Sequence, residues 1–113
     1  LVIAAGGSMR RFNALKPTGV QTWLSGVGNM FPKAELAFRQ DTSRIDIIKD
    51  FENPMFGVFM KMGWHKAMRE AIRQLTLGCL INGEPFAKVT DEERTVIKKV
   101  LKEMKEQCRK HGF

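Results

Sequence analysis

Two apolar segments near the start of the chain constrain its fold most, because each of them ends in glycine. The first segment is "LVIAA" (1–5), stopped by Gly6 and Gly7, and the second is "VQTWLSG" (20–26). A short continuous apolar run is typical of a strand that is buried on both faces, as in a parallel sheet. Both segments are therefore predicted to be buried parallel strands.

A segment with helical spacing follows each of these strands. Ser8 precedes "MRRFNALK" at the position of a helix N-cap, and Pro17 and Gly19 end that helix. A second helix is expected to begin near Phe31, with Pro32 in its first turn, and to run through "KAELAFRQ". The first forty residues thus predict the order strand, helix, strand, helix.

After residue 41 the spacing is helical throughout. "TSRIDIIKDFE" predicts a helix capped by Thr42 or Ser43, and Asn53-Pro54 is expected to break or redirect the chain. A further helix with Gly78 as its stop is predicted, and then a last helix with a capping box of Thr90 and Glu93. The expected buried stripe of this last helix is Val96, Ile97, Val100, Leu101 and Met104.

Two strands alone do not form a stable parallel sheet, because such a sheet needs cover on both faces and neighbours at its edges. The missing strands are expected from a partner chain or from residues upstream of Leu1, since the chain starts with an apolar run and no Met. The sequence is therefore interpreted as the later part of a longer protein.

The net charge of +7 raises the question of an anionic partner. Most basic residues lie in the C-terminal half, where glutamates alternate with them, which favours a solvated helix face over a nucleic-acid stripe. The first acidic residue is Glu35, so the N-terminal third would repel an anion little. The chain has only two cysteines, which favours a reducing compartment. It has no apolar run of eighteen residues and no signal peptide, so a soluble cytoplasmic protein without membrane contact is predicted.

The loops that follow the two strands are the candidate ligand face. Ligands of parallel α/β folds bind at the carboxyl ends of strands, and helix N-termini there favour a carboxylate or phosphate. Gly6, Gly7, Gly26 and Gly28 would permit close backbone approach, and the Asn29 amide could orient a ligand or cap the next helix. The alternative that the glycines only serve tight turns stays open. "GVGNMF" lacks the third glycine of a dinucleotide motif.

Other chemistry-bearing residues indicate no site of their own. Ser8 and Ser25 are outside a nucleophile elbow, and His65 has no second ligand at metal-binding spacing. Cys79 and Cys108 are expected to be plain thiols, buried or half-buried. No metal and no cofactor is predicted.

Four segments together resemble a known family. "LVIAAGGSMRRF", "VQTWLSGVGNMFPKAEL", "FENPMFGVFMKMGWHKAMREAI" and "GEPFAKVTDEERTVIKKVL" follow one another as in the C-terminal part of the dihydrodipicolinate synthase/N-acetylneuraminate lyase family, nearest to its sugar-acid dehydratase and aldolase branches. The resemblance implies an α/β fold, with the last two strands of a (β/α)8 TIM barrel in residues 1–41 and a C-terminal helical subdomain in 42–113. More than half of the barrel would then be absent.

The resemblance also implies a function and a set of site residues. Members are class I Schiff-base lyases, often tetrameric, that act on pyruvate or other 2-oxo acids. Gly6 and Leu24 match pocket-lining positions, while the Schiff-base lysine lies on a strand before Leu1, so that no catalytic residue is expected in this chain. The substrate-binding residues expected are Gly6, Gly7, Leu24, Gly26 and Asn29.

The leading interpretation is the C-terminal portion of an aldolase or dehydratase of 2-oxo acids or keto-deoxy sugar acids, inactive by itself and part of a homo-oligomer. The alternative is a basic helical module that binds an anionic partner such as RNA. This alternative leaves the glycine-ended apolar strands unexplained, and no aromatic residues alternate with its basic face. The sequence does not distinguish cleavage from dehydration.

Overall fold

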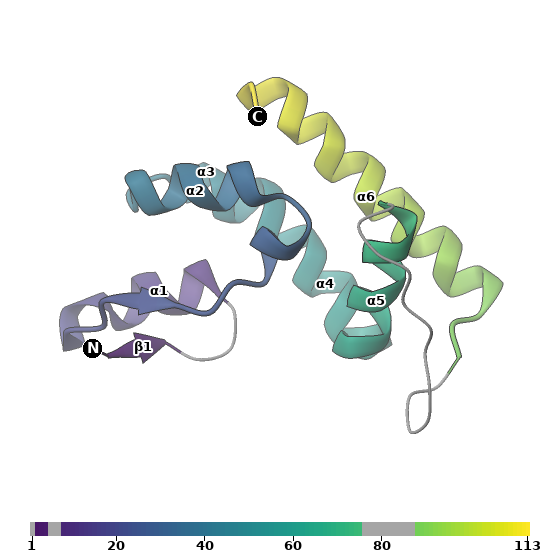
Figure 1. The fold of residues 1–113 in the computed structure, drawn as a ribbon, viewed down its shortest axis with the longest axis horizontal. Helices are drawn as coiled ribbons and strands as arrows, with labels where there is room; N and C mark the ends of the chain where they lie inside the picture. The colour runs from purple at the N-terminus through teal and green to yellow at the C-terminus, as the bar shows by residue number, and fades with distance from the viewer. Residues whose placement is uncertain (1, 5–7, 76–87) are drawn as a thin grey trace. The chain divides into compact units, whose positions relative to one another are not determined.

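The computed structural model describes residues 2–4, 8–75 and 88–113 of the 113-residue chain (Figure 1). Its elements in chain order are β1 (Ile3–Ala4), α1 (Met9–Leu15), η1 (Lys16–Thr18), β2 (Thr22–Trp23), η2 (Val27–Asn29), α2 (Pro32–Gln40), α3 (Ile45–Ile47), η3 (Ile48–Glu52), α4 (Asn53–Met62), α5 (Trp64–Gln74) and α6 (Asp91–His111). Two compact units result, one of Leu1–Asn53 with Phe113 and the other of Pro54–Gly112. None of the described helices has the length and apolar character needed to cross a membrane.

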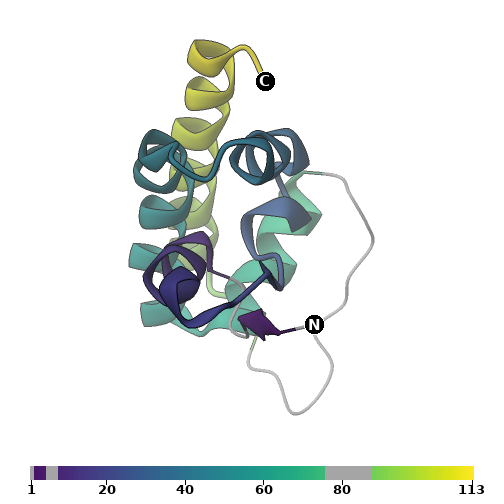
Figure 2. The ribbon, with the colours of Figure 1, turned by 90° about the vertical axis from the view of Figure 1, so that its left-hand side faces the viewer.

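The strands β1 and β2 pair in parallel, as the sequence predicts. Ile3 lies opposite Thr22 and Ala4 opposite Trp23, and the backbone N–H of Leu24 donates to the carbonyl of Ala4 over 3.2 Å. The helix α1 lies between the strands in sequence and contacts both of them (Figure 2). The order strand, helix, strand, helix is therefore confirmed for the described part of the N-terminal unit.

The expectation that both faces of these strands are buried is wrong. Ala4 and Trp23 are only 3% and 4% exposed, but Val2, Ile3 and Leu24 are 55%, 46% and 57% exposed. Trp23 is covered by two aromatic rings, Phe12 at 4.6 Å and Phe38 at 5.4 Å between ring centroids. Phe12 of α1 and Phe38 of α2 thus cover Trp23 on one face, and Ile3 and Leu24 on the other face stay in contact with solvent.

The expected fold class, part of a (β/α)8 TIM barrel, is wrong for this chain. The described residues are mostly helical (74%) and contain only two short parallel strands, each of two residues. The barrel was implied by the family resemblance. Every periodic segment after Gly26 has helical spacing, so the described residues supply no further strands to extend the pair.

The chain stays helical through Asn53-Pro54, where a break was expected. The backbone is helical from Ile45 to Met62, but the segment Ile48–Glu52 is a π-helix. Pro54 has no N–H to donate to the carbonyl four residues before it, and its ring would clash with that carbonyl. A local widening to the π form accommodates this constraint. The N-cap residue of α3 is Arg44 and not Thr42 or Ser43 as expected, and the Arg44 side chain makes no capping hydrogen bond.

The second unit contains the capping box that the sequence predicts. The Thr90 hydroxyl accepts from the N–H of Glu93 over 3.1 Å, and the Glu93 carboxylate accepts from the N–H of Thr90 over 3.0 Å. The buried stripe of α6 is confirmed for Ile97, Val100, Leu101 and Met104. Val96 is 44% exposed and does not belong to it. The expected stop at Gly78 lies outside the described residues.

Candidate functional site

The loop after β2 carries three of the expected substrate-binding residues. Gly26 is buried and is the N-cap residue of η2, whereas the side chains of Leu24 and Asn29 are exposed. The amide nitrogen of Asn29 donates to the carbonyl of Ser25 over 3.3 Å, which ties the two ends of this short loop together. Leu24 and Asn29 therefore both lie at its solvent-facing rim. The other two expected residues, Gly6 and Gly7, lie outside the described residues.

A buried carboxylate lies directly beneath this loop. Glu35 of α2 is 4% exposed and accepts the indole N–H of Trp23 on Oε1 over 2.6 Å and the backbone N–H of Gly28 on Oε2 over 2.9 Å. A Cβ at Gly28 would collide with the Ser25 hydroxyl and lie 3.3 Å from Oε2 of Glu35. Glycine at this position thus serves the close packing of the loop on Glu35.

Arg39, one turn further along α2, completes the cluster. Its guanidinium lies 4.0 Å from the centre of the Trp23 ring and 3.7 Å from Oε1 of Glu35. It also donates to the carbonyl of Trp23 over 3.1 Å and to the hydroxyl of Thr22 over 2.9 Å. The cation partly neutralises the buried carboxylate and fastens α2 to the end of β2.

The first helix has a buried carboxylate at its N-terminus as well. Glu52 of η3 is 2% exposed and accepts the backbone N–H of Met9 over 2.6 Å, the N–H of Arg10 over 3.0 Å and the hydroxyl of Ser8 over 2.9 Å. The Ser8 hydroxyl also accepts from the N–H of Arg11 over 3.1 Å, which confirms Ser8 as the N-cap. A carboxylate is favoured here by the free N–H groups and the helix dipole.

Both places where the sequence predicts a ligand anion thus hold a carboxylate of the chain itself. The N–H groups of Met9 and Arg10 bind Glu52, and the N–H of Gly28 binds Glu35. A ligand carboxylate at this edge of the strand pair has to use other donors, of which the exposed side-chain amide of Asn29 is one.

Sequence reasoning missed these two glutamates. The signal for Glu35 is its position as the first acidic residue of the chain, one turn into a helix that follows a glycine loop. Glu52 gives no comparable signal, because its partners are 42 to 44 residues away in sequence.

No described lysine resembles a Schiff-base nucleophile. Lys16 and Lys33 are exposed, and Lys66, which is only partly exposed, donates to Glu93 over 2.7 Å and lowers the pKa of that carboxyl. A nucleophilic lysine needs a desolvated pocket, which none of these positions provides.

Other reactive groups among the described residues also form no centre. Cys108 is half-buried, and burial raises the pKa of its thiol, which makes it less reactive. Within the described residues, no three His, Cys, Asp or Glu side chains are placed to hold a metal ion.

Comparisons with protein-family models, with curated proteins and with solved structures find no match to this chain.

Proposed function

We propose that this chain is part of a pyruvate-type Schiff-base lyase, an aldolase or dehydratase of 2-oxo acids or keto-deoxy sugar acids. One structural observation supports it beside the sequence resemblance: β1 and β2 pair in parallel, with α1 between them in sequence. Parallel pairing brings the carboxyl ends of both strands to the same edge, where ligands of parallel sheets bind.

The residues at that edge form one side of the substrate site. Leu24 presents an apolar side chain that is 57% exposed, and Asn29 presents an exposed amide within five residues of it. Gly26, which is buried, lets the backbone turn between them, and Gly6 and Gly7 follow the neighbouring strand. An apolar contact and an amide donor suit the methyl or methylene group and the carboxylate of a 2-oxo acid.

The reactive lysine comes from polypeptide other than the described residues. The amine of this lysine adds to the 2-oxo carbon, and the carbinolamine that forms loses water to give an iminium. In an aldolase the iminium accepts the electron pair released by carbon–carbon cleavage. In a dehydratase it accepts the electron pair released by deprotonation, which precedes loss of a substrate hydroxyl as water. The contribution of this chain is to bind and orient the substrate and, as in the tetramers of the resembling family, to build subunit contacts.

Borohydride trapping tests the proposal. The protein expressed from the complete gene is incubated with pyruvate or a keto-deoxy sugar acid, reduced with borohydride, and measured by intact mass. A covalent adduct of the reduced substrate on one lysine is expected, together with a tetrameric mass in native conditions. If no 2-oxo acid leaves an adduct, the lyase proposal is rejected.

A further inference from the structure

A basic groove runs between α5 and α6 in the second unit. A hollow of about 330 Å³ is lined by Arg73, Gln74, Arg94, Thr95 and Lys98. A second hollow shares Gln74 and Lys98 with it and extends along α6 to Lys102 and Lys105. Among the described residues, no acidic side chain lines either hollow. The two hollows together, called the α5–α6 groove, thus present five cationic side chains.

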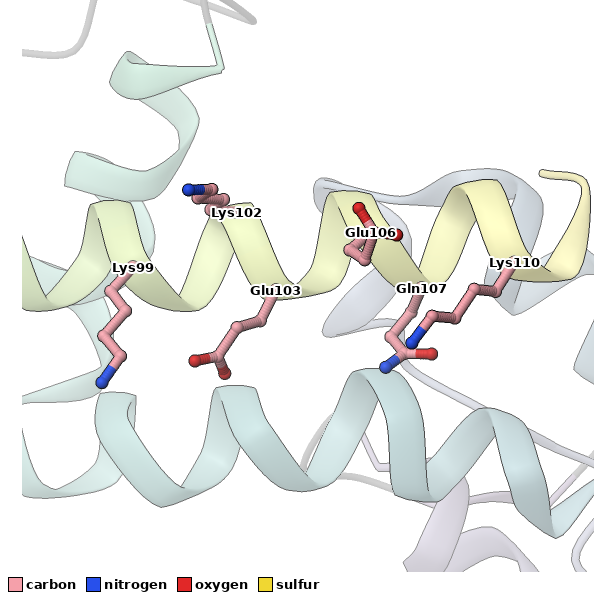
Figure 3. A pocket seen from close by; sticks show the side chains of 6 residues that line it. All are labelled: Lys99, Lys102, Glu103, Glu106, Gln107 and Lys110. Carbon is pink, nitrogen blue, oxygen red and sulfur yellow. The ribbon is translucent and has the colours of Figure 1, made fainter.

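The neighbouring side of α6 differs in charge (Figure 3). There the lining is mixed, because Glu103 and Glu106 lie among Lys99, Lys102 and Lys110, and Lys102 and Glu106 point to the opposite side of the helix from Glu103. Lys102 thus borders both the mixed hollow and the groove, whereas Lys98 and Lys105 line only the groove. The groove differs from the mixed hollow in that its described lining holds cations and no carboxylate.

A buried glutamate holds the two arginines of the groove in place. Glu70 is 4% exposed and accepts from Nε and Nη2 of Arg73 over 2.9 and 2.6 Å, and the Nε of Arg94 lies 3.6 Å from it. Arg94 also donates to Asp91 over 2.9 Å. These contacts order the arginines before any ligand binds, which lowers the entropy lost on binding.

The three lysines of the groove lack such partners. Among the described residues, Lys98, Lys102 and Lys105 make no ion pair. They are spaced four and three residues apart on one face of α6, so that they span roughly 10 Å along the helix. With Glu70 and Asp91 counted against the five cations, the groove keeps three positive charges.

We propose that the α5–α6 groove binds a small, linear anion that carries several phosphate groups. A row of unpaired ammonium groups matches a row of phosphates, and the two fixed guanidinium groups fit phosphate oxygens at one end of that row. Single-stranded nucleic acid fits less well, because its bases stack on aromatic side chains and none of the described residues that line the groove is aromatic. Binding here is independent of the lyase chemistry.

Calorimetric titration of the chain with tripolyphosphate tests the proposal. The variant Lys98→Gln/Lys105→Gln removes two charges from the groove, and Lys99→Gln/Lys110→Gln removes two from the mixed side of the same helix. We expect saturable binding at low ionic strength, weakened about tenfold by the groove variant and by less than about threefold by the matched variant. Helicity by circular dichroism serves to show that both variants are folded.

Three results would overturn the proposal. The first is no saturable binding of tripolyphosphate at low salt. The second is an equal loss of affinity in both double variants, which indicates attraction by overall charge. The third is tighter binding of single-stranded RNA with the same dependence on Lys98 and Lys105, in which case the ligand is nucleic acid.

Discussion

At the scale of single residues, two buried glutamates explain why the glycine loops and helix starts look like ligand sites. A loop that opens its backbone N–H groups toward an anion needs the same glycines whether the anion is a ligand or a side chain. In this chain Glu35 is the anion at Gly28, and Glu52 is the anion at the start of α1. The sequence therefore predicts the anion but not its source.

Replacing Glu35 by glutamine tests how much its carboxylate stabilises the loop. Both oxygens of Glu35 accept from N–H donors, Trp23 Nε1 and Gly28 N. An amide offers one oxygen and turns its NH₂ group toward the other donor, so that one buried N–H loses its partner. We expect Glu35→Gln to lower the free energy of unfolding by about 1–3 kcal/mol, measured by urea denaturation.

Glu103→Gln is the control for this experiment, because Glu103 is exposed and lies on the mixed side of α6. Its stability should stay within about 0.5 kcal/mol of the parent chain. Equal stabilities of Glu35→Gln and Glu103→Gln would mean that the loop does not depend on the buried carboxylate.

At the scale of elements, the sequence predicts what local chemistry decides. Ser8 caps α1, and Thr90 with Glu93 caps α6, because each cap bonds to N–H groups within a few residues. Pro32 begins α2 because its fixed φ suits the first helical position. Strand burial and the carboxylates of the candidate site depend on contacts between distant residues. The continuous apolar runs therefore gave a wrong prediction of two-sided burial, since the segments that cover a face are not encoded in the strand itself.

The link between α5 and α6 through Glu70 predicts a pH dependence of stability. Hydrogen bonds from Arg73 lower the pKa of Glu70 below its usual value. A carboxyl with a lower pKa in the folded state adds stability above its unfolded pKa and loses this contribution as the pH falls through the folded pKa. We expect Glu70→Gln to cost about 1 kcal/mol at pH 7, since Arg73 and Arg94 are 51% and 47% exposed, and the difference to shrink below about pH 5.

This difference in stability is measured by urea denaturation of the parent and Glu70→Gln chains at several pH values from about 2.5 to 7, because carboxyl groups titrate in this pH range. The curve of Glu103→Gln should run parallel to that of the parent chain. A stability difference of Glu70→Gln that stays constant across this range would contradict a role for the charge and leave only the packing of the side chain.

At the scale of the whole molecule, the two units differ in net charge. Pro54–Gly112 holds twelve basic and seven acidic residues, a net charge of +5, whereas Leu1–Asn53 holds seven and five, a net charge of +2. Leu24, an exposed apolar residue of the less charged unit, directly follows the carboxyl end of β2, whereas the exposed Val2 and Ile3 lie at the amino end of β1. An exposed apolar side chain at the end of β2 suits contact with a small organic acid or further polypeptide, and the more strongly positive unit suits phosphates.

Two leucines of nearly equal exposure, Leu24 and Leu36, test whether the proposed substrate contacts the carboxyl end of β2. Leu24 at the end of β2 is 57% exposed, and Leu36 on α2 is 56% exposed. In the chain by itself, Leu24→Asn and Leu36→Asn should each change the free energy of unfolding by less than about 0.5 kcal/mol, because neither side chain is buried. If the proposed Schiff-base function holds, Leu24→Asn in the protein expressed from the complete gene should lower the rate of borohydride-trapped adduct formation about tenfold, since an apolar contact with the substrate is lost. Leu36→Asn should leave that rate unchanged. Adduct formation that is indifferent to Leu24→Asn, or equally sensitive to both substitutions, would place the substrate away from the carboxyl end of β2 even in a protein that forms the Schiff base.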